Sequence, residues 1–330
     1  MPISRGRKKK VKMHHQNKLV DKTRKAIRDA LDRSDERGLL PVRVLCANLT
    51  DLFFKISPDF KTEFENEVYN GLHDKIIYKI ETNPVRDVAE LNPQQQIVLH
   101  ENFNQYLWNI CYSLLVLFDK GIHEPRLKGI HTGTLADTPM VVEAWKVFQA
   151  GLSLRNTYQR SVFFELPNSE LNQSREYILK TNATYLAALN FILLHEFAHQ
   201  YYGHYSYFEP GDQSKKDEHL ADEFAIDRMS AHFDGGNGKT LKAGILMGTL
   251  SLLFLHKQLG GGTSHPDLDS RLKIIIESLH LDELDNLWGL ASLALNLWSN
   301  DFGHDVRIPP VGETYQELFY ETLKDLSRFK

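Results

Sequence analysis

The run HEFAH at residues 195–199 matches the pattern H-E-x-x-H. Residues four apart on a helix project from the same face, so His195 and His199 can bind one metal ion. Glu196 then lies beside the ion, where it can take a proton from an attacking water molecule. The spacing predicts two zinc ligands and a general base.

A catalytic zinc ion needs a third protein ligand and an open position for water. Glu218 lies nineteen residues after His199 on the next predicted helix, beyond a turn that contains Pro210 and Gly211. A helix–turn–helix hairpin would return this carboxylate to the metal. We therefore expect Glu218 to be the ligand in preference to its neighbours, Asp217 and His219.

His204 is the competing third ligand. The metzincin pattern H-E-x-x-H-x-x-G-x-x-H places its third histidine ten residues after the first. His204 lies nine residues after His195, and Gly203 is out of register as well. The spacing favours Glu218 over His204.

Asp222 follows Glu218 by one helical turn, on the same face. Metal-bound imidazoles usually donate their second N–H to a carboxylate, so Asp222 is a candidate for that role. The alternative is an exposed charge on the helix, because acidic residues crowd this segment.

The segment SHPDLDSR at residues 264–271 follows a glycine-rich turn and leads into a predicted helix. His265 and Arg271 could converge on the metal and stabilise the oxyanion of a tetrahedral intermediate. A loop that caps the helix and forms salt bridges is the alternative.

The helices that must position these residues are visible as apolar patterns. The motif lies on a helix from about Asn182 to Tyr202, closed by Gly203, with a core face of Leu186, Leu189, Leu193 and Phe197. Further helices are expected at about Ile97–Phe118, Thr138–Leu152, Ser214–Met229, Thr240–Lys257, Leu268–Leu279, Leu284–Trp298 and Tyr315–Lys324.

Short strands are expected at Arg43–Leu45, Ile76–Glu81 and Ser161–Leu166, the last halted by Pro167. An extended substrate could add to the edge strand near Val162–Glu165. We therefore expect the fold class to be α+β and mostly helical: a catalytic core with an active-site helix and a short sheet, plus an N-terminal supporting subdomain. The expected divisions are a basic tail with an amphipathic helix (1–40), the supporting subdomain (41–135) and the catalytic domain (136–330).

The composition, with 42% hydrophobic and 25% charged residues, is that of a globular protein. Cys46 and Cys111 are too few for a disulfide framework or a cysteine zinc site, which suits a reducing cytoplasm. The chain opens without a secretory leader, and the apolar stretch Ala243–Leu255 is shorter than the roughly 20 residues of a membrane span. We expect a cytoplasmic protein in which that stretch is a buried helix.

Residues 5–28 hold eleven Lys and Arg and one acidic residue, Asp21. Such a tail can bind nucleic acid or an acidic partner, but a solvated terminus is the favoured interpretation. The tail leaves open a rival function as a nucleic-acid-associated factor. A second rival is a regulatory protein in which zinc only holds the helix–turn–helix hairpin together.

The three elements HEFAH, EHLAD and SHPDLDSR resemble the gluzincin class of zinc peptidases, including the CAAX-prenyl endopeptidase relatives. Residues 144–271, with LPN at 166–168, YI at 177–178, Asn182, LHEFAH at 194–199 and GH at 203–204, look like the Lit-type phage-exclusion peptidases. The resemblance implies a zincin-like metallopeptidase fold for residues 136–330. It implies a bacterial or prophage-encoded cytoplasmic endopeptidase in antiviral defence. It also implies elongation factor Tu as the substrate, a phage capsid peptide as the activator, and oxyanion roles for His265 and Arg271.

Overall fold

The computed structural model describes residues 76–79, 85, 89–91, 97–130, 135–156, 172–204, 211–262, 265–304, 314–326 and 328. Several expectations lie outside these residues: the basic tail with its amphipathic helix, Cys46, the strand at 43–45 and the edge strand at 161–166. Nucleic-acid binding through residues 5–28 therefore stays a prediction.

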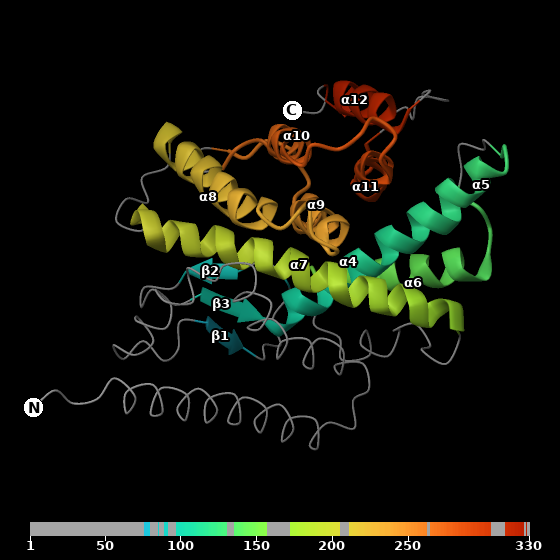
Figure 1. Ribbon diagram of the computed structural model, residues 1–330, viewed down its shortest axis with the longest axis horizontal. Coiled ribbons are helices and arrows are strands. Elements are labelled where there is room, and N and C mark those ends of the chain that lie inside the picture. Colours follow the sequence, from blue (N-terminus) through green and yellow to red (C-terminus); the bar gives the residue numbers. More distant parts are fainter. Residues whose placement is uncertain are drawn as a thin grey trace, which may run out of the picture.

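The described part of the chain is mostly helical, as expected (Figure 1). In chain order the helices are α4 (Glu101–Phe118), the π-helix η2 (Asp119–His123), α5 (Glu124–Leu127), α6 (Pro139–Ser153), α7 (Asn172–Tyr202), α8 (Asp212–Ser230), α9 (Gly238–Leu253), α10 (Leu268–Ser278), α11 (Asn286–Asp301) and α12 (Tyr315–Leu326). Every helix predicted from residue 138 onward is confirmed, and apart from α7 the ends shift by only a few residues. Local capping explains two starts: the Thr138 side chain accepts from the Val141 N–H at α6, and Asp285 accepts from the Leu287 N–H at α11.

Helix α7 is the central element, and α4, α8 and α9 pack against it. It begins at Asn172, ten residues before the predicted start at Asn182. Asn182 is tolerated inside the helix because its side-chain oxygen accepts a hydrogen bond from Trp108 Nε1 of α4 at 2.8 Å. Of the predicted core face, Leu189, Leu193 and Phe197 are buried, and Leu186 packs half-buried against the core.

A three-stranded sheet lies on one side of α7, opposite the helices α8 to α12 (Figure 1). Its order is β1-β3-β2, with β1 (Ile76–Lys79) parallel and β2 (Ala89–Leu91) antiparallel to the central β3 (Ile97–His100). The helix predicted from Ile97 was wrong at its start, because residues 97–100 form β3 and α4 begins at Glu101. The β-branched Ile97 and Val98 are buried in the middle of the sheet, where such side chains pack well.

Helix α9 crosses α7 closely because glycine faces the crossing. A Cβ at Gly244 would lie 2.3 Å from Cβ of Ala187, and one at Gly248 would lie 3.1 Å from Cδ1 of Phe191. This confirms that the apolar stretch beginning at Ala243 belongs to a buried helix. In the described residues no helix has the length and apolar character to cross a bilayer.

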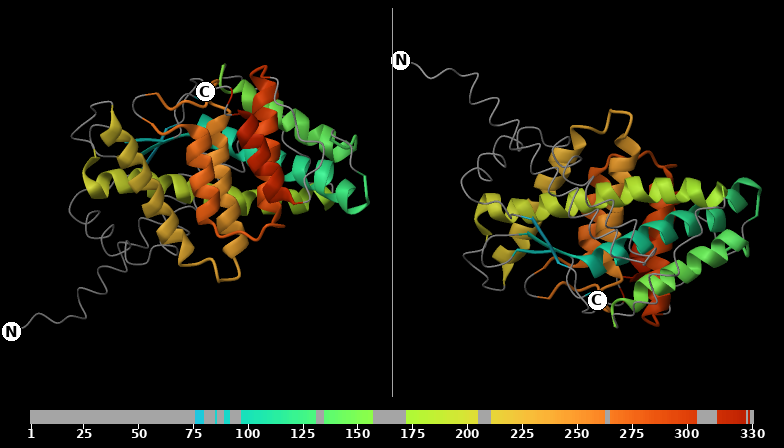
Figure 2. Two further views of the ribbon diagram at one scale, coloured as in Figure 1. Left: turned by 90° about the horizontal axis from the view of Figure 1, so that it is seen from above. Right: turned by 90° about the horizontal axis from the view of Figure 1, so that it is seen from below.

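One hydrophobic core runs through the described residues from Val85 to Leu326. Helix α4 is buried along almost its entire length and packs against α6, α7 and α11. Figure 2 shows α4 and α6 beside α7, with the C-terminal helices lying across it. The division into subdomains near residue 135 stays a prediction, and the core does not break there.

Candidate active site

The H-E-x-x-H residues lie near the C-terminal end of α7, where α8 crosses it (Figure 2). Gly203 ends α7 with a φ of 69°, the left-handed conformation expected of a C′ glycine. Ala198 of α7 and Ala221 of α8 are fully buried, and such small side chains allow two helices to approach closely. The hairpin brings the start of α8 back toward the histidines, as the sequence predicts.

The three predicted ligands meet at this crossing. Nε2 of His195 and Nε2 of His199 are 3.2 Å apart. Oε2 of Glu218 lies 3.3 Å from Nε2 of His195, and Oε1 lies 3.5 Å from Nε2 of His199. Among the described residues these three side chains form a group that could hold a metal ion.

These separations suit zinc. A tetrahedral ion with bonds of about 2.0–2.1 Å keeps its ligand atoms about 3.3 Å apart. The two Nε2 atoms are 3.2 Å apart, and each lies within 3.5 Å of one oxygen of Glu218, Oε2 for His195 and Oε1 for His199, which is close to that edge length. Two imidazoles and one carboxylate are also a donor set used by catalytic zinc.

Asp222 orients His195. Its Oδ1 lies 2.9 Å from Nδ1 of His195, and both side chains are buried. When this contact holds the imidazole proton on Nδ1, the lone pair of Nε2 faces the other two ligands. The contact is the one that the helical spacing of Glu218 and Asp222 suggested.

Arg271 reaches Asp222 from α10. Its Nε lies 2.7 Å from Oδ2 of Asp222 and its Nη2 lies 2.7 Å from Oδ1, so the guanidinium holds the carboxylate with two hydrogen bonds. Nη1 lies 3.7 Å from Oε2 of Glu218. Arg271 is buried, and these contacts link α10 to Glu218 and Asp222 of α8.

His265 lies at the exposed rim of the site. Its side chain is 59% exposed, and its Nε2 is 3.7 Å from Oε1 of Glu218. Glu196 is half-buried, and its charge helps to raise the pKa of Arg271. The base role of Glu196 and the oxyanion roles of His265 and Arg271 stay predictions.

Opposing effects set the charges of the site. Burial lowers the pKa of His195, but hydrogen bonds to Asp222 and Glu218 outweigh it and raise the pKa to about 10. Burial raises the pKa of Glu218, but His195 and Arg271 bring it down to about 2, and Asp222 is shifted down as well. Burial and the neighbouring His195 lower the pKa of His199 to about 4. Without a metal, one proton on His195 therefore balances part of the negative charge near neutral pH.

Two of the three alternative ligands, His204 and Asp217, have a different place in the structure. His204 lies next to His199 through Nδ1, the ring nitrogen that does not face the other ligands, at 3.0 Å. Asp217 lies 3.6 Å from Nε2 of His204. The sequence analysis does not predict the contacts from His199 to His204 and from His204 to Asp217. The signal in the sequence that could have indicated them is a histidine directly after Gly203, where α7 ends.

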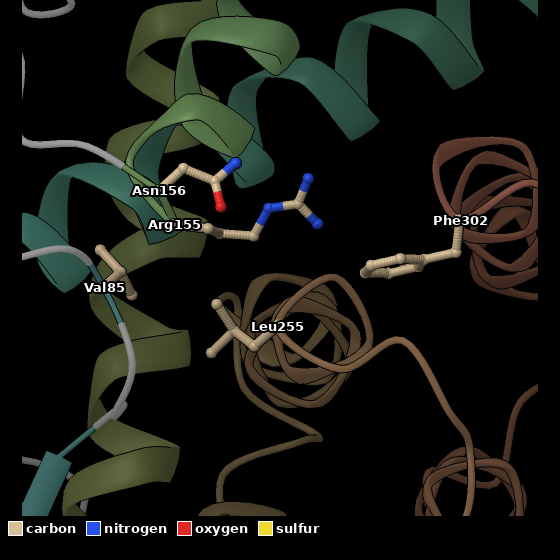
Figure 3. Close-up of a pocket in the computed structure, with 5 residues that line it drawn as sticks. All are labelled: Val85, Arg155, Asn156, Leu255 and Phe302. Carbon is tan, nitrogen blue, oxygen red and sulfur yellow. The ribbon is translucent and has the colours of Figure 1, made fainter.

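A separate cavity of about 390 Å³ is lined by Val85, Arg155, Asn156, Leu255 and Phe302 (Figure 3). The Arg155 side chain points toward the Phe302 ring. Its Nη1 lies 2.7 Å from Asp301 and also donates to the Phe254 carbonyl at 2.5 Å. The guanidinium is thus already engaged, and this cavity contains none of the predicted site residues.

Comparison with known families defines the class of this protein. Residues 97–291 match Peptidase U49, so the matched segment extends from β3 into α11 and includes every predicted site residue. The match covers more than half of the chain. The chain therefore belongs to the peptidase U49 family, which is the Lit family, and its family function is that of a peptidase. Searches of curated proteins and of solved structures give no match.

Proposed function

We propose that the protein is a zinc-dependent endopeptidase that hydrolyses a peptide bond in a protein substrate, with His195, His199 and Glu218 as the metal ligands. One observation carries this proposal. In a chain of a peptidase family, the ligand atoms of two histidines and one glutamate lie within 4.8 Å of one another, beside a second glutamate in the H-E-x-x-H position.

The residues around the ligands would divide the chemistry. A zinc ion held there supplies Lewis acidity that activates water and polarises the peptide carbonyl. Glu196 takes the proton from the attacking water and passes it to the leaving amine. His265, at the exposed rim, donates to the developing oxyanion, while Arg271 assists from the opposite side of Glu218 and holds Asp222 in place.

A structural zinc site is the alternative, and it would be closed by a fourth protein ligand. His204 and His219 are the candidates for that ligand. The contact of His204 with the far ring nitrogen of His199 supports an open position for water instead. Counting the water molecules bound to the metal by spectroscopy would separate the two sites.

The resemblance to Lit-type peptidases suggests the biological setting. We propose that the substrate is a protein of the bacterial cytoplasm, with elongation factor Tu as the first candidate. A phage capsid peptide would be the activator, and cleavage would serve antiviral defence. Incubating purified elongation factor Tu with the full chain, with and without that peptide, tests the substrate and the activator together.

Glu196→Gln tests the reaction itself. The variant should keep its zinc but cleave about 10²–10⁴-fold more slowly, because glutamine cannot accept the proton. Bound zinc is measured by mass spectrometry, and cleavage by new N-termini in a bacterial lysate. Glu223→Gln, an exposed carboxylate on α8, is the matched control and should behave like the wild type. Wild-type cleavage by the Glu196 variant, or a wild-type chain that binds no zinc, contradicts the proposal.

A further inference from the structure

The two histidine ligands of the proposed site have different partners at their second ring nitrogen. Nδ1 of His195 lies against the Asp222 carboxylate at 2.9 Å. Nδ1 of His199 lies against another imidazole nitrogen, Nδ1 of His204, at 3.0 Å. An ionised carboxylate can only accept a hydrogen bond from its imidazole, whereas a neighbouring histidine can either donate or accept one. A further group is therefore needed to decide which of the two histidines, His199 or His204, donates the hydrogen bond between them.

The proton positions follow from the geometry. Two ring nitrogens 3.0 Å apart share one hydrogen atom in a hydrogen bond. If Nε2 of His199 presents its lone pair to a metal, the proton of this neutral imidazole is on Nδ1, and it is donated to Nδ1 of His204. The proton of His204 is then on Nε2. Asp217 faces that nitrogen at 3.6 Å, which is longer than a hydrogen bond but close enough for the carboxylate charge to attract the polar N–H.

Asp217 thus favours the tautomer that the metal site requires. With the proton of His204 on Nδ1 instead, a bare lone pair on Nε2 would face the carboxylate, and His199 would carry its own proton on the nitrogen that should bind the metal. The negative charge of Asp217 disfavours that arrangement electrostatically.

Neighbouring residues hold this pair in place. The left-handed Gly203 turns the chain at the end of α7, directly before His204. The Tyr202 ring stacks on His204, with centroids 5.5 Å apart and planes at 23°. Gln213 Nε2 donates to Oδ1 of Asp217 at 2.8 Å. The side chains of His204 and Asp217 are only 11% and 15% exposed, so water competes little for their contact.

We propose that His204 and Asp217 are a positioning pair, which fixes the tautomer and ring orientation of His199 and thereby strengthens metal binding without contacting the ion. This inference rests on the proposed zinc site. Groups that orient metal-bound histidines typically change metal affinity by about 10–100-fold when they are removed.

The test is the zinc affinity of the full chain, measured by competition with a chelating dye. Asp217→Asn and His204→Leu should each weaken zinc binding by about 10–100-fold. His204→Asn should bind more tightly than His204→Leu, because the amide oxygen can replace Nδ1 as an acceptor whereas leucine only fills the volume. Asp227→Asn, an exposed position on the same helix, is the control and should bind like the wild type.

The absorption spectrum of the cobalt-substituted chain provides the second measurement. His204→Leu should keep the wild-type band shape, because His204 is not a ligand. A changed coordination spectrum overturns the proposal, as does equal zinc affinity of the leucine and asparagine variants. If Asp217→Asn binds zinc as tightly as the wild type, Asp217 does not position His204 and the proposed pair is refuted. A wild-type chain that binds no zinc refutes the proposed function as well, so the two failures are distinguishable.

Discussion

His195 has the most connected position in the site. Its Nδ1 contacts Asp222, its Nε2 contacts Glu218, and its ring is buried. Two carboxylates around one buried imidazole stabilise a proton there strongly, which is why the pKa rises although burial opposes it. A metal ion bound by Nε2 must displace that proton, since only the neutral imidazole can be a ligand.

This linkage predicts how the stability of the metal-free chain depends on pH. The folded pKa of His195 is about 10, above the unfolded value of about 6.5, so its contribution is fully present below pH 6.5 and is lost as the pH rises toward 10. Within that window the free energy of unfolding should fall by about 1.4 kcal/mol per pH unit from this group. Urea unfolding with a chelator at pH 7 and pH 9 measures it.

His195→Gln supplies the comparison for this prediction. The variant lacks the titrating group, so its free energy of unfolding should fall less between pH 7 and pH 9 than that of the wild type. Titrating groups outside the site are shared by the two chains, and their effects cancel in the difference. An equal pH dependence of the two chains argues against the raised pKa.

At the scale of elements, three helices build the site. Helix α7 carries the histidines, α8 carries Glu218 and Asp222, and α10 contributes Arg271. Without α10, the buried Asp222 carboxylate would face His195 but no side chain with a permanent positive charge. The guanidinium of Arg271 compensates this carboxylate with two hydrogen bonds and fixes α10 against α8.

Arg271→Ala should therefore destabilise the chain by about 3–5 kcal/mol, because it leaves a buried carboxylate without its charged partner. The double variant Arg271→Ala with Asp222→Ala should lose less than the sum of the two single variants, since the uncompensated charge is gone. Chemical unfolding measures both. Lys273→Ala, an exposed position on α10, is the control. Strict additivity of the two single variants would refute the coupling.

For the whole molecule, the site joins parts of the chain that are distant in sequence. The ligands and their supporting side chains extend from His195 to Arg271, and the helices that carry them share one core with α4. A metal at this place would hold the α7–α8 hairpin closed. Any ion that binds the folded chain more tightly than the unfolded chain stabilises the folded state.

Zinc should accordingly raise the unfolding temperature of the entire chain. At a free zinc concentration 1,000 times the dissociation constant, the stabilisation should reach about 4.1 kcal/mol. Glu196→Gln should keep this stabilisation, whereas Glu218→Gln should lose most of it, because only Glu218 is a proposed ligand. Calorimetry with zinc and with a chelator measures the effect. A Glu218 variant stabilised as strongly as the wild type contradicts this ligand set.

The sequence alone determined the features that depend on local spacing. The i, i+4 separation puts His195 and His199 on one helix face, a C′ glycine stops α7, and a second helix of the right length returns Glu218. The same spacing rule placed Asp222 beside His195. Each of these follows from spacing within one helix or within one helix–turn–helix hairpin.

Only the tertiary structure decided the remainder, because it depends on partners far away in the chain. Residues 97–100 are a strand since β1 and β2 pair with them, although their apolar character equally suits a helix. Arg271 binds Asp222 across forty-nine residues. His204, close in sequence to both histidine ligands, contacts the far side of the His199 ring because the left-handed turn at Gly203 directs it there and Asp217 of α8 faces it.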